Sequence, residues 1–340
     1  MKQEEINALK ARIEKNPQDY EAVEAYAVAL SDMGENEEAL KNFIFLKNQF
    51  PDNAMNYYNI GIILEKLKMN NDAILAYEKA HELDSEDTDF MYNLAIVLIK
   101  ADRHDEAEQL LLKVIETDNE DENSYFHLGE IYTRKKDTQN AIKYLSKAVE
   151  LDNNDAIAKF YLAYQCKEAG YIDDAITLYD QVISQSPDYS WAYYNLAAIY
   201  TEQGDEHKAI MCLNSTVKTN PSDIKAVKLL VKLLCKQNQY DKALHHLENT
   251  LKILPDEADL YYLMAEINKQ TGNKEAYSKY ISSAYEKKLT FTGDEKALEA
   301  EYKKLQNEIQ PPPKEEKKEE PKKQAQAAQT QKNTPKTSKT

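Results

Sequence analysis

A repeat of 34 residues runs through most of this chain of 340 residues and constrains its fold more than any other feature. The prolines that precede the C-terminal segment are separated by 34, 136, 34 and 34 residues: Pro17, Pro51, Pro187, Pro221 and Pro255. An alanine recurs in its own phase without a gap: Ala39, Ala73, Ala107, Ala141, Ala175, Ala209 and Ala243. A fixed period of this length indicates a stack of repeated supersecondary units.

Within each unit the apolar residues have helical spacing. In residues 54–87, Tyr57, Gly61 and Leu64 recur at steps of four and three, and a second helical pattern follows a polar break. This spacing predicts two helices of three to four turns in each unit. Small residues at Gly61 and Ala73 allow the two helices to approach closely.

Glycine and proline mark the predicted helix ends. Gly34, Gly170 and Gly204 suit the left-handed residue that ends the first helix. The prolines cannot continue the second helix, so each closes a unit. In the last unit Ala276 stands one residue before the alanine phase, so we expect a unit one residue short, with a distorted turn between its helices.

These residues resemble the tetratricopeptide repeat (TPR) family. The resemblance is carried by Tyr57-Tyr58-Asn59-Ile60-Gly61 with Leu64, Ala73, Tyr77 and Ala80, and by Tyr193-Tyr194-Asn195-Leu196-Ala197 with Tyr200, Ala209 and Leu213. It implies an all-α fold, a right-handed α-solenoid of about eight tandem helix-turn-helix repeats. The eight units are residues 20–53, 54–87, 88–121, 122–155, 156–189, 190–223, 224–257 and 258–290.

The two ends differ from the repeats. We expect a leading half-repeat helix in residues 1–19 and a capping helix in residues 291–310, which begins with a capping box of Thr292 and Glu295. Residues 311–340 are rich in Lys, Glu, Gln and Pro, and we expect disorder there. This basic tail has three possible roles: folding back on the chain, weak contact with acidic membranes or RNA, or solubility.

Composition excludes several classes of function. The net charge of −16 disfavours nucleic acid as a partner, because phosphate binding needs a basic footprint. Three cysteines make no disulfide framework, and a polar N-terminus without an apolar run indicates a cytoplasmic protein with no membrane span. No phosphate-binding loop or metal motif is present, so we expect no catalytic residues, cofactor, metal or small-molecule substrate.

The resemblance further implies that the first helices line a concave groove for a peptide of another protein. Position 5 of the units carries a ladder of aromatic residues: Tyr58, Tyr92, Phe126, Phe160 and Tyr194. Position 6 carries amides in three units: Asn59, Asn93 and Asn195. Rings offer a rigid amphipathic surface, and an amide matches a peptide unit with both donor and acceptor. The alternatives are rings that pack on neighbouring helices and amides that join helices.

The seventh unit adds a basic stripe. Four lysines share one helix face at i, i+3, i+7 and i+11: Lys225, Lys228, Lys232 and Lys236. Their mutual repulsion implies an anionic partner, either an internal one formed by Asp259 and Glu266 or an acidic segment of another protein. The family's clamp for a chaperone C-terminus is disfavoured, because Phe160, Tyr164 and Leu229 replace three of its residues.

We therefore expect a non-catalytic protein–protein interaction scaffold or adaptor. Its partner would be an extended or helical segment of another protein, with an acidic segment as one option. One alternative is a regulatory or substrate-recruiting subunit of an enzyme complex, by analogy with glycosyltransferases that carry TPR arms. A co-chaperone and a self-assembling structural protein are the remaining alternatives.

Overall fold

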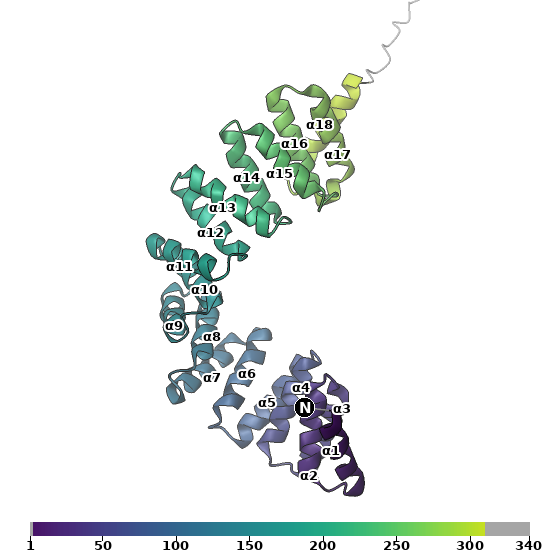
Figure 1. Cartoon of the computed structure of the whole chain (residues 1–340). Coiled ribbons are helices and arrows are strands. Elements are labelled where there is room, and N and C mark those ends of the chain that lie inside the picture. The colour runs from purple at the N-terminus through teal and green to yellow at the C-terminus, as the bar shows by residue number, and fades with distance from the viewer. Residues whose placement is uncertain (1–2, 310–340) are drawn as a thin grey trace, which may run out of the picture. The chain divides into compact units, whose positions relative to one another are not determined.

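A computed structural model describes residues 3–309, which contain helices and no strand (Figure 1). The first helices of the repeats are α2 (Tyr20–Asp32), α4 (Ala54–Lys66), α6 (Thr88–Lys100), α8 (Glu122–Arg134), α10 (Ala156–Glu168), α12 (Ser190–Glu202), α14 (Ile224–Lys236) and α16 (Ala258–Thr271). The second helices are α3 (Asn36–Gln49), α5 (Asn70–Leu83), α7 (His104–Thr117), α9 (Thr138–Leu151), α11 (Ile172–Gln185), α13 (Glu206–Thr219), α15 (Tyr240–Leu251) and α17 (Lys274–Glu286). The remaining elements are α1 (Gln3–Lys15), the 3-10 turn η1 (Lys288–Thr290) and α18 (Glu295–Ile309). The predicted disordered tail, residues 311–340, lies outside the described residues.

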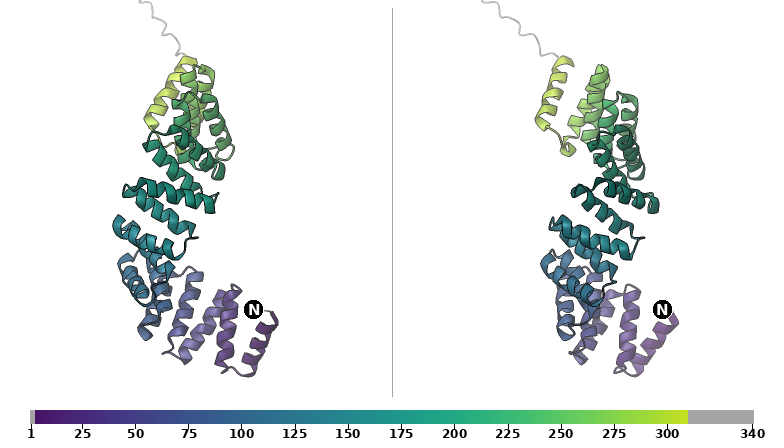
Figure 2. Two further views of the ribbon diagram at one scale, coloured as in Figure 1. Left: turned by 60° about the vertical axis from the view of Figure 1, so that its left-hand side comes forward. Right: turned by 90° about the vertical axis from the view of Figure 1, so that its left-hand side faces the viewer.

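The described helices form two compact parts, and the boundary falls inside α15, between His246 and Leu247. In the first part every helix from α1 to α13 packs against the next helix along the chain (Figure 2). In the second part α17 packs against both α16 and α18, and η1 packs against α16. Each helix pair thus buries apolar surface that it could not cover alone, which is the basis of stability in repeat proteins.

Small residues set the close packing within each pair. The recurring alanine of the second helix is 0% exposed in all seven repeats that carry it: Ala39, Ala73, Ala107, Ala141, Ala175, Ala209 and Ala243. A Cβ atom added to Gly61 of α4 would lie 2.5 Å from Cε1 of Tyr77 in α5. The predicted close approach at Gly61 and Ala73 is therefore confirmed.

A left-handed residue ends the first helix in all eight repeats. The predicted glycines Gly34, Gly170 and Gly204 have φ of 83°, 85° and 78°. Four residues other than glycine adopt φ between 56° and 61° in the same phase: Lys68, Asp102, Lys136 and Asn238. The surrounding packing therefore imposes this turn even where the residue pays a steric penalty for it.

Side-chain caps fix where most first helices begin. The residue before the helix accepts a hydrogen bond from a backbone N–H of the first turn in six repeats: Asp19, Asn53, Asp87, Asp121, Asp155 and Asp223. Such caps contribute about 1 kcal/mol each. In the eighth repeat Thr290 takes over this role, because its Oγ1 accepts from the N–H of Ala258 at 2.8 Å.

The eighth repeat keeps its register, so the expected distortion of its turn is wrong. Gly272 has φ of 80°, and α17 begins at Lys274, 34 residues after the start of α15. The alanine phase falls on Tyr277, whose half-buried ring lies under the Lys269 ammonium group at 5.4 Å. Ala276 therefore does not indicate the register of this repeat. The turn at Gly272 keeps the 34-residue phase, and Tyr277 occupies the position of the recurring alanine.

The cap of α18 also differs from the prediction. Asp294 Oδ1 accepts from the backbone N–H groups of Lys296 and Ala297, at 3.0 and 3.2 Å, and so caps this helix. Thr292 instead donates from its Oγ1 to Asp259 Oδ2 at 2.5 Å. The expected capping box is wrong because the side chain of Thr292 joins the linker to α16.

Candidate peptide-binding surface

The aromatic ladder joins consecutive first helices. The Tyr58 ring of α4 lies 4.8 Å from the Phe90 ring of α6, between ring centroids, and the Tyr58 hydroxyl accepts from Nδ2 of Asn93 at 3.0 Å. The ring also lies 5.8 Å from Tyr77 of α5. Tyr58 is therefore a half-buried ring that contacts its own repeat and the next one.

The later rings of the ladder repeat this arrangement. Tyr92 lies 6.0 Å from His127, Phe126 lies 5.5 Å from Tyr161, and Phe160 lies 5.1 Å from Tyr189, which directly precedes α12. In each case a ring at position 5 contacts a ring of the next first helix or of the residue directly before it. We call the face formed by positions 2, 5, 6, 9 and 13 the first-helix surface, and these contacts make it continuous from α4 to α12.

Cations at position 13 tie some of the same helices together. Lys66 donates to Ser31 Oγ of the preceding first helix at 2.7 Å, and Lys100 pairs with Glu65 of α4 at 2.7 Å. Arg134 pairs within α8, with Glu130 at 3.1 Å. All three cations of position 13 therefore have partners within the chain.

The three amides of position 6 have different environments. Asn93 donates both to Tyr58 and to the carbonyl oxygen of Asp89, at 3.0 and 2.8 Å. Asn195 donates to the carbonyl oxygen of Trp191 at 2.8 Å. Asn59 is half-buried. Asn93 thus joins two helices through its Nδ2, which is one of the two predicted roles of these amides. Its Oδ1 accepts no hydrogen bond from residues 3–309 and could serve the other predicted role, contact with a peptide N–H.

A pocket of about 310 Å³ opens where α6 and α8 meet on this surface. Its lining combines apolar and charged groups: Ile96, Ile99, Lys100, Asp102, His127, Glu130 and Arg134. Glu130 contacts His127 Nδ1 at 3.3 Å as well as Arg134. The hydrogen bond with His127, and after it the bond with Arg134, lowers the pKa of the Glu130 carboxyl. The pocket is suited to a polar side chain above an apolar floor.

The basic stripe lies opposite the core face of α14. Lys225, Lys232 and Lys236 are exposed and Lys228 is half-buried, whereas the buried face of the helix is apolar: Val227, Leu230, Val231 and Leu234. Lys236 pairs with Glu206 of α13. In the C-terminal part, Asp259 accepts from Thr292 and Glu266 lies 3.7 Å from Lys269. The predicted internal pairing of the stripe stays a prediction.

Sequence reasoning missed a group of exposed apolar residues on this surface in repeats five and six. Ile157 and Tyr164 of α10 are 50% and 38% exposed, and Trp191 of α12 is 56% exposed. They stand at positions 2 and 9, which the helical pattern already assigns to the first-helix surface. The available signal was the single tryptophan of the chain in a surface position.

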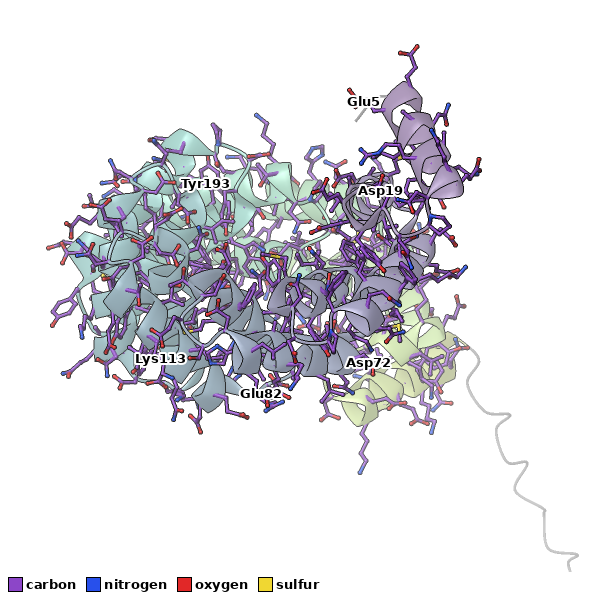
Figure 3. The ribbon with its side chains drawn as sticks, turned by 90° about the horizontal axis from the view of Figure 1, so that it is seen from below. Glu5, Asp19, Asp72, Glu82, Lys113 and Tyr193 are labelled. Atoms are coloured by element: carbon purple, nitrogen blue, oxygen red, sulfur yellow. The ribbon has the colours of Figure 1, made fainter. Side chains whose placement is uncertain are left out.

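The second helices carry a different kind of side chain. Asp72 and Glu82 of α5 and Lys113 of α7, which Figure 3 labels, are exposed. Exposed charged residues of this kind are typical of a solvated helix face. The aromatic and amide series is thus a property of the first helices.

The chemically reactive side chains serve packing. Burial raises the pKa of the Cys166 and Cys212 thiols to about 11, which suppresses the nucleophilic thiolate. Within residues 3–309 no group of three or more His, Cys, Asp or Glu side chains is placed to hold a metal ion. No helix in that range is long and apolar enough to cross a membrane.

Stacked helix pairs with a continuous first-helix surface define an α-helical repeat protein of the solenoid class. Sequence profiles of the tetratricopeptide repeat match residues 1–50, 66–128 and 122–155. A further profile, anaphase-promoting complex, cyclosome, subunit 3, matches residues 168–250. The chain belongs to the tetratricopeptide repeat family, as the repeated residues predicted, and the all-α solenoid fold class is confirmed.

Solved structures agree with this assignment. YrrB, a TPR protein with an unusual peptide-binding site, is 25% identical with a TM-score of 0.50, and the match covers 55% of this chain and 96% of YrrB. Pseudomonas aeruginosa PilF is 17% identical with a TM-score of 0.55, covering 63% and 97%. The C-terminal part of a TPR protein from Cytophaga hutchinsonii is 21% identical with a TM-score of 0.55, covering 66% and 92%. The last two matches bear on the fold alone, and no curated protein matches the chain.

Proposed function

We propose that this chain is a non-catalytic scaffold that binds a peptide segment of another protein along its first-helix surface, in the cytoplasm. The observation that carries the proposal is the continuity of that surface. Side-chain contacts link α4, α6, α8, α10 and the start of α12 in one uninterrupted series. YrrB, whose fold is similar, has a peptide-binding site, which supports the same use of the fold here.

The surface offers preorganised groups for an extended peptide. The half-buried rings Tyr92, Phe126 and Phe160 are held by their neighbours, so binding immobilises little further side-chain motion. Within residues 3–309, Asn93 uses its Nδ2 in two hydrogen bonds and its Oδ1 in none, and Asn195 donates one hydrogen bond, to the carbonyl oxygen of Trp191. Rings then supply contact area, and amides supply hydrogen bonds to a peptide backbone of any sequence.

Affinity capture with matched variants tests this proposal. The tagged full chain is compared with a Tyr194→Ala, Asn195→Ala variant and with Met211→Ala, which changes an exposed residue of the second helix α13. We expect the captured proteins to be lost or strongly reduced with the double variant and retained with Met211→Ala. Equal capture by all three proteins, with equal helicity by circular dichroism, contradicts the proposal.

A second candidate is a subunit of a larger assembly, including the regulatory arm of an enzyme. The match of residues 168–250 to the profile of an anaphase-promoting complex subunit favours this candidate. Mass photometry of the tagged protein isolated at native abundance distinguishes the two. A complex of fixed stoichiometry that contains a catalytic subunit supports the second candidate, and a free chain with exchangeable partners contradicts it.

A further inference from the structure

An apolar patch covers the first-helix surface of repeats five and six. We define the patch as Ile157 and Tyr164 of α10 together with Trp191 and Tyr194 of α12. Ile157 and Tyr164 are seven residues apart and so lie on one helix face. Trp191 is the most exposed of the four, at 56%, and its ring lies 6.4 Å from that of Tyr194. Large exposed apolar groups that gather on one surface mark an interaction site.

The two halves of the patch belong together in space. Phe160, three residues after Ile157, lies 5.1 Å from Tyr189, and Tyr189 stands two residues before Trp191. The start of α12 is therefore placed beside α10. Trp191 and Ile157 occupy the same position of consecutive repeats, so the patch runs along the direction of the stack.

Two unneutralised lysines follow the patch in the next repeat. Within residues 3–246, no carboxylate lies within ion-pair distance of Lys225 or Lys232 of α14. This differs from Lys100, Arg134 and Lys236, which have acidic partners on neighbouring or the same helices. The charge of Lys225 and Lys232 is thus available to a ligand. It is a local exception on a chain with a net charge of −16.

We propose that α10, α12 and α14 bind an extended peptide that combines an apolar anchor with acidic residues. The anchor packs on Trp191, and the acidic residues contact Lys225 and Lys232. The lysines lie one repeat beyond Trp191, so the acidic residues lie to one side of the anchor along the peptide. This inference rests on the proposed peptide-binding function and names the chemistry of the peptide.

Charge selects the orientation of such a peptide. At physiological salt the screening length is about 8 Å, so an acidic side chain beside α14 responds mainly to the charges next to it, among them Lys225 and Lys232. A peptide placed in the reverse direction would set its acidic residues beside α10, where Ile157 and Tyr164 offer no cation. A nucleic acid is a poorer fit, because two lysines make a small phosphate footprint.

A random peptide display library, selected against the full chain, supplies the probe. We expect the enriched peptides to carry Asp or Glu to one side of a Trp, Phe, Leu or Ile anchor. The best peptide without tryptophan is then synthesised with a fluorescent label, and its Kd is measured by anisotropy. Because Trp191 is the only tryptophan of the chain, a blue shift of its emission on binding reports burial at the patch itself.

Two variants test the two halves of the site. Trp191→Ala should weaken binding about 30-fold, the effect of a hot-spot aromatic residue. Lys225→Glu, Lys232→Glu should weaken it about tenfold or more and abolish its salt dependence. Met211→Ala and Lys218→Glu, both on α13, are the matched controls and should leave Kd unchanged. Circular dichroism of each variant verifies that the helices are intact.

The outcomes separate the inference from the proposed function. Enriched peptides without acidic residues, an unchanged Trp191 emission, or an unchanged Kd for the lysine variant overturns the inference. If such peptides still lose affinity in a Tyr92→Ala, Asn93→Ala variant, binding elsewhere on the first-helix surface stands. If the folded chain enriches no peptide at all, the proposed function fails together with the inference.

Discussion

Two tyrosines at the same position of different repeats should respond oppositely to loss of the hydroxyl group. Tyr77 and Tyr179 are each 0% exposed and occupy position 24 of repeats two and five. The Tyr77 hydroxyl donates to Oε2 of Glu65 at 3.0 Å. The Tyr179 hydroxyl is buried and has no hydrogen-bond partner among residues 3–309. The difference follows from position 12, where repeat two has the acceptor Glu65 and repeat five has Lys167, which has no acceptor.

The magnitudes follow from the hydrogen bonds. Tyr77→Phe removes a bond to a charged acceptor that keeps its pair with Lys100, so we expect a loss of about 1.5 kcal/mol. Tyr179→Phe removes an unsatisfied buried group, so we expect a gain of about 1 kcal/mol. Arrays of repeats need not unfold in one step, so a local measurement is the better assay.

Hydrogen exchange of the amide protons in α5 and α11 provides that assay. We expect Tyr77→Phe to speed exchange in α5 about tenfold and Tyr179→Phe to slow exchange in α11 about fivefold, since 1.4 kcal/mol corresponds to a factor of ten. Each variant serves as the control for the other. Faster exchange by similar factors in both variants would refute the assignment of one satisfied and one unsatisfied hydroxyl.

Three further predictions follow from the packing and the titrating groups. Gly61→Ala should lower the free energy of unfolding by about 1 kcal/mol in urea, because overpacking against Tyr77 outweighs the better helix propensity of alanine. The loss should be smaller in a Tyr77→Leu background. An equal loss in that background would show that the Tyr77 ring is not the cause. The Glu130 carboxyl has a lowered pKa in the folded chain, so its contribution to stability is present above the ordinary Glu pKa and is lost as the pH falls through the lowered value. Glu130→Gln should therefore show a smaller drop in Tm than the unaltered chain between about pH 5 and about pH 3. An equal drop in both proteins would argue against this role of Glu130. Cys166 and Cys212, with pKa raised to about 11, should be alkylated far more slowly at pH 8 than free cysteine, as mass spectrometry would record; alkylation at the free rate would disprove their burial.

The 34-residue period determined most of the fold. It located the helix pairs, the buried alanines and the turn at Gly34, Gly170 and Gly204, because these depend on steric limits that act locally in every repeat. It gave no reason to expect a left-handed Lys68 or Lys136, where packing overrides local preference. The expected distortion in the eighth repeat is wrong because Ala276 does not mark the register, whereas Gly272 does.

The candidate site was less predictable than the fold. Helical spacing assigned Tyr58 and Asn93 to one surface, but their mutual hydrogen bond depends on how α4 and α6 approach each other. The exposure of Trp191 likewise depends on what the neighbouring helices leave uncovered. A single sequence reveals which residues share a helix face, and the three-dimensional packing decides which of them remain accessible to a partner.

Site-specific photo-cross-linking tests the central claim most directly. A photoreactive phenylalanine analogue replaces Tyr194 on the first-helix surface or, as the matched position, Met211 on the second helix α13, which is 59% exposed. Irradiation in cells followed by mass spectrometry should yield a defined partner adduct from position 194 and none from position 211. Adducts from position 211 alone would contradict binding along the first helices.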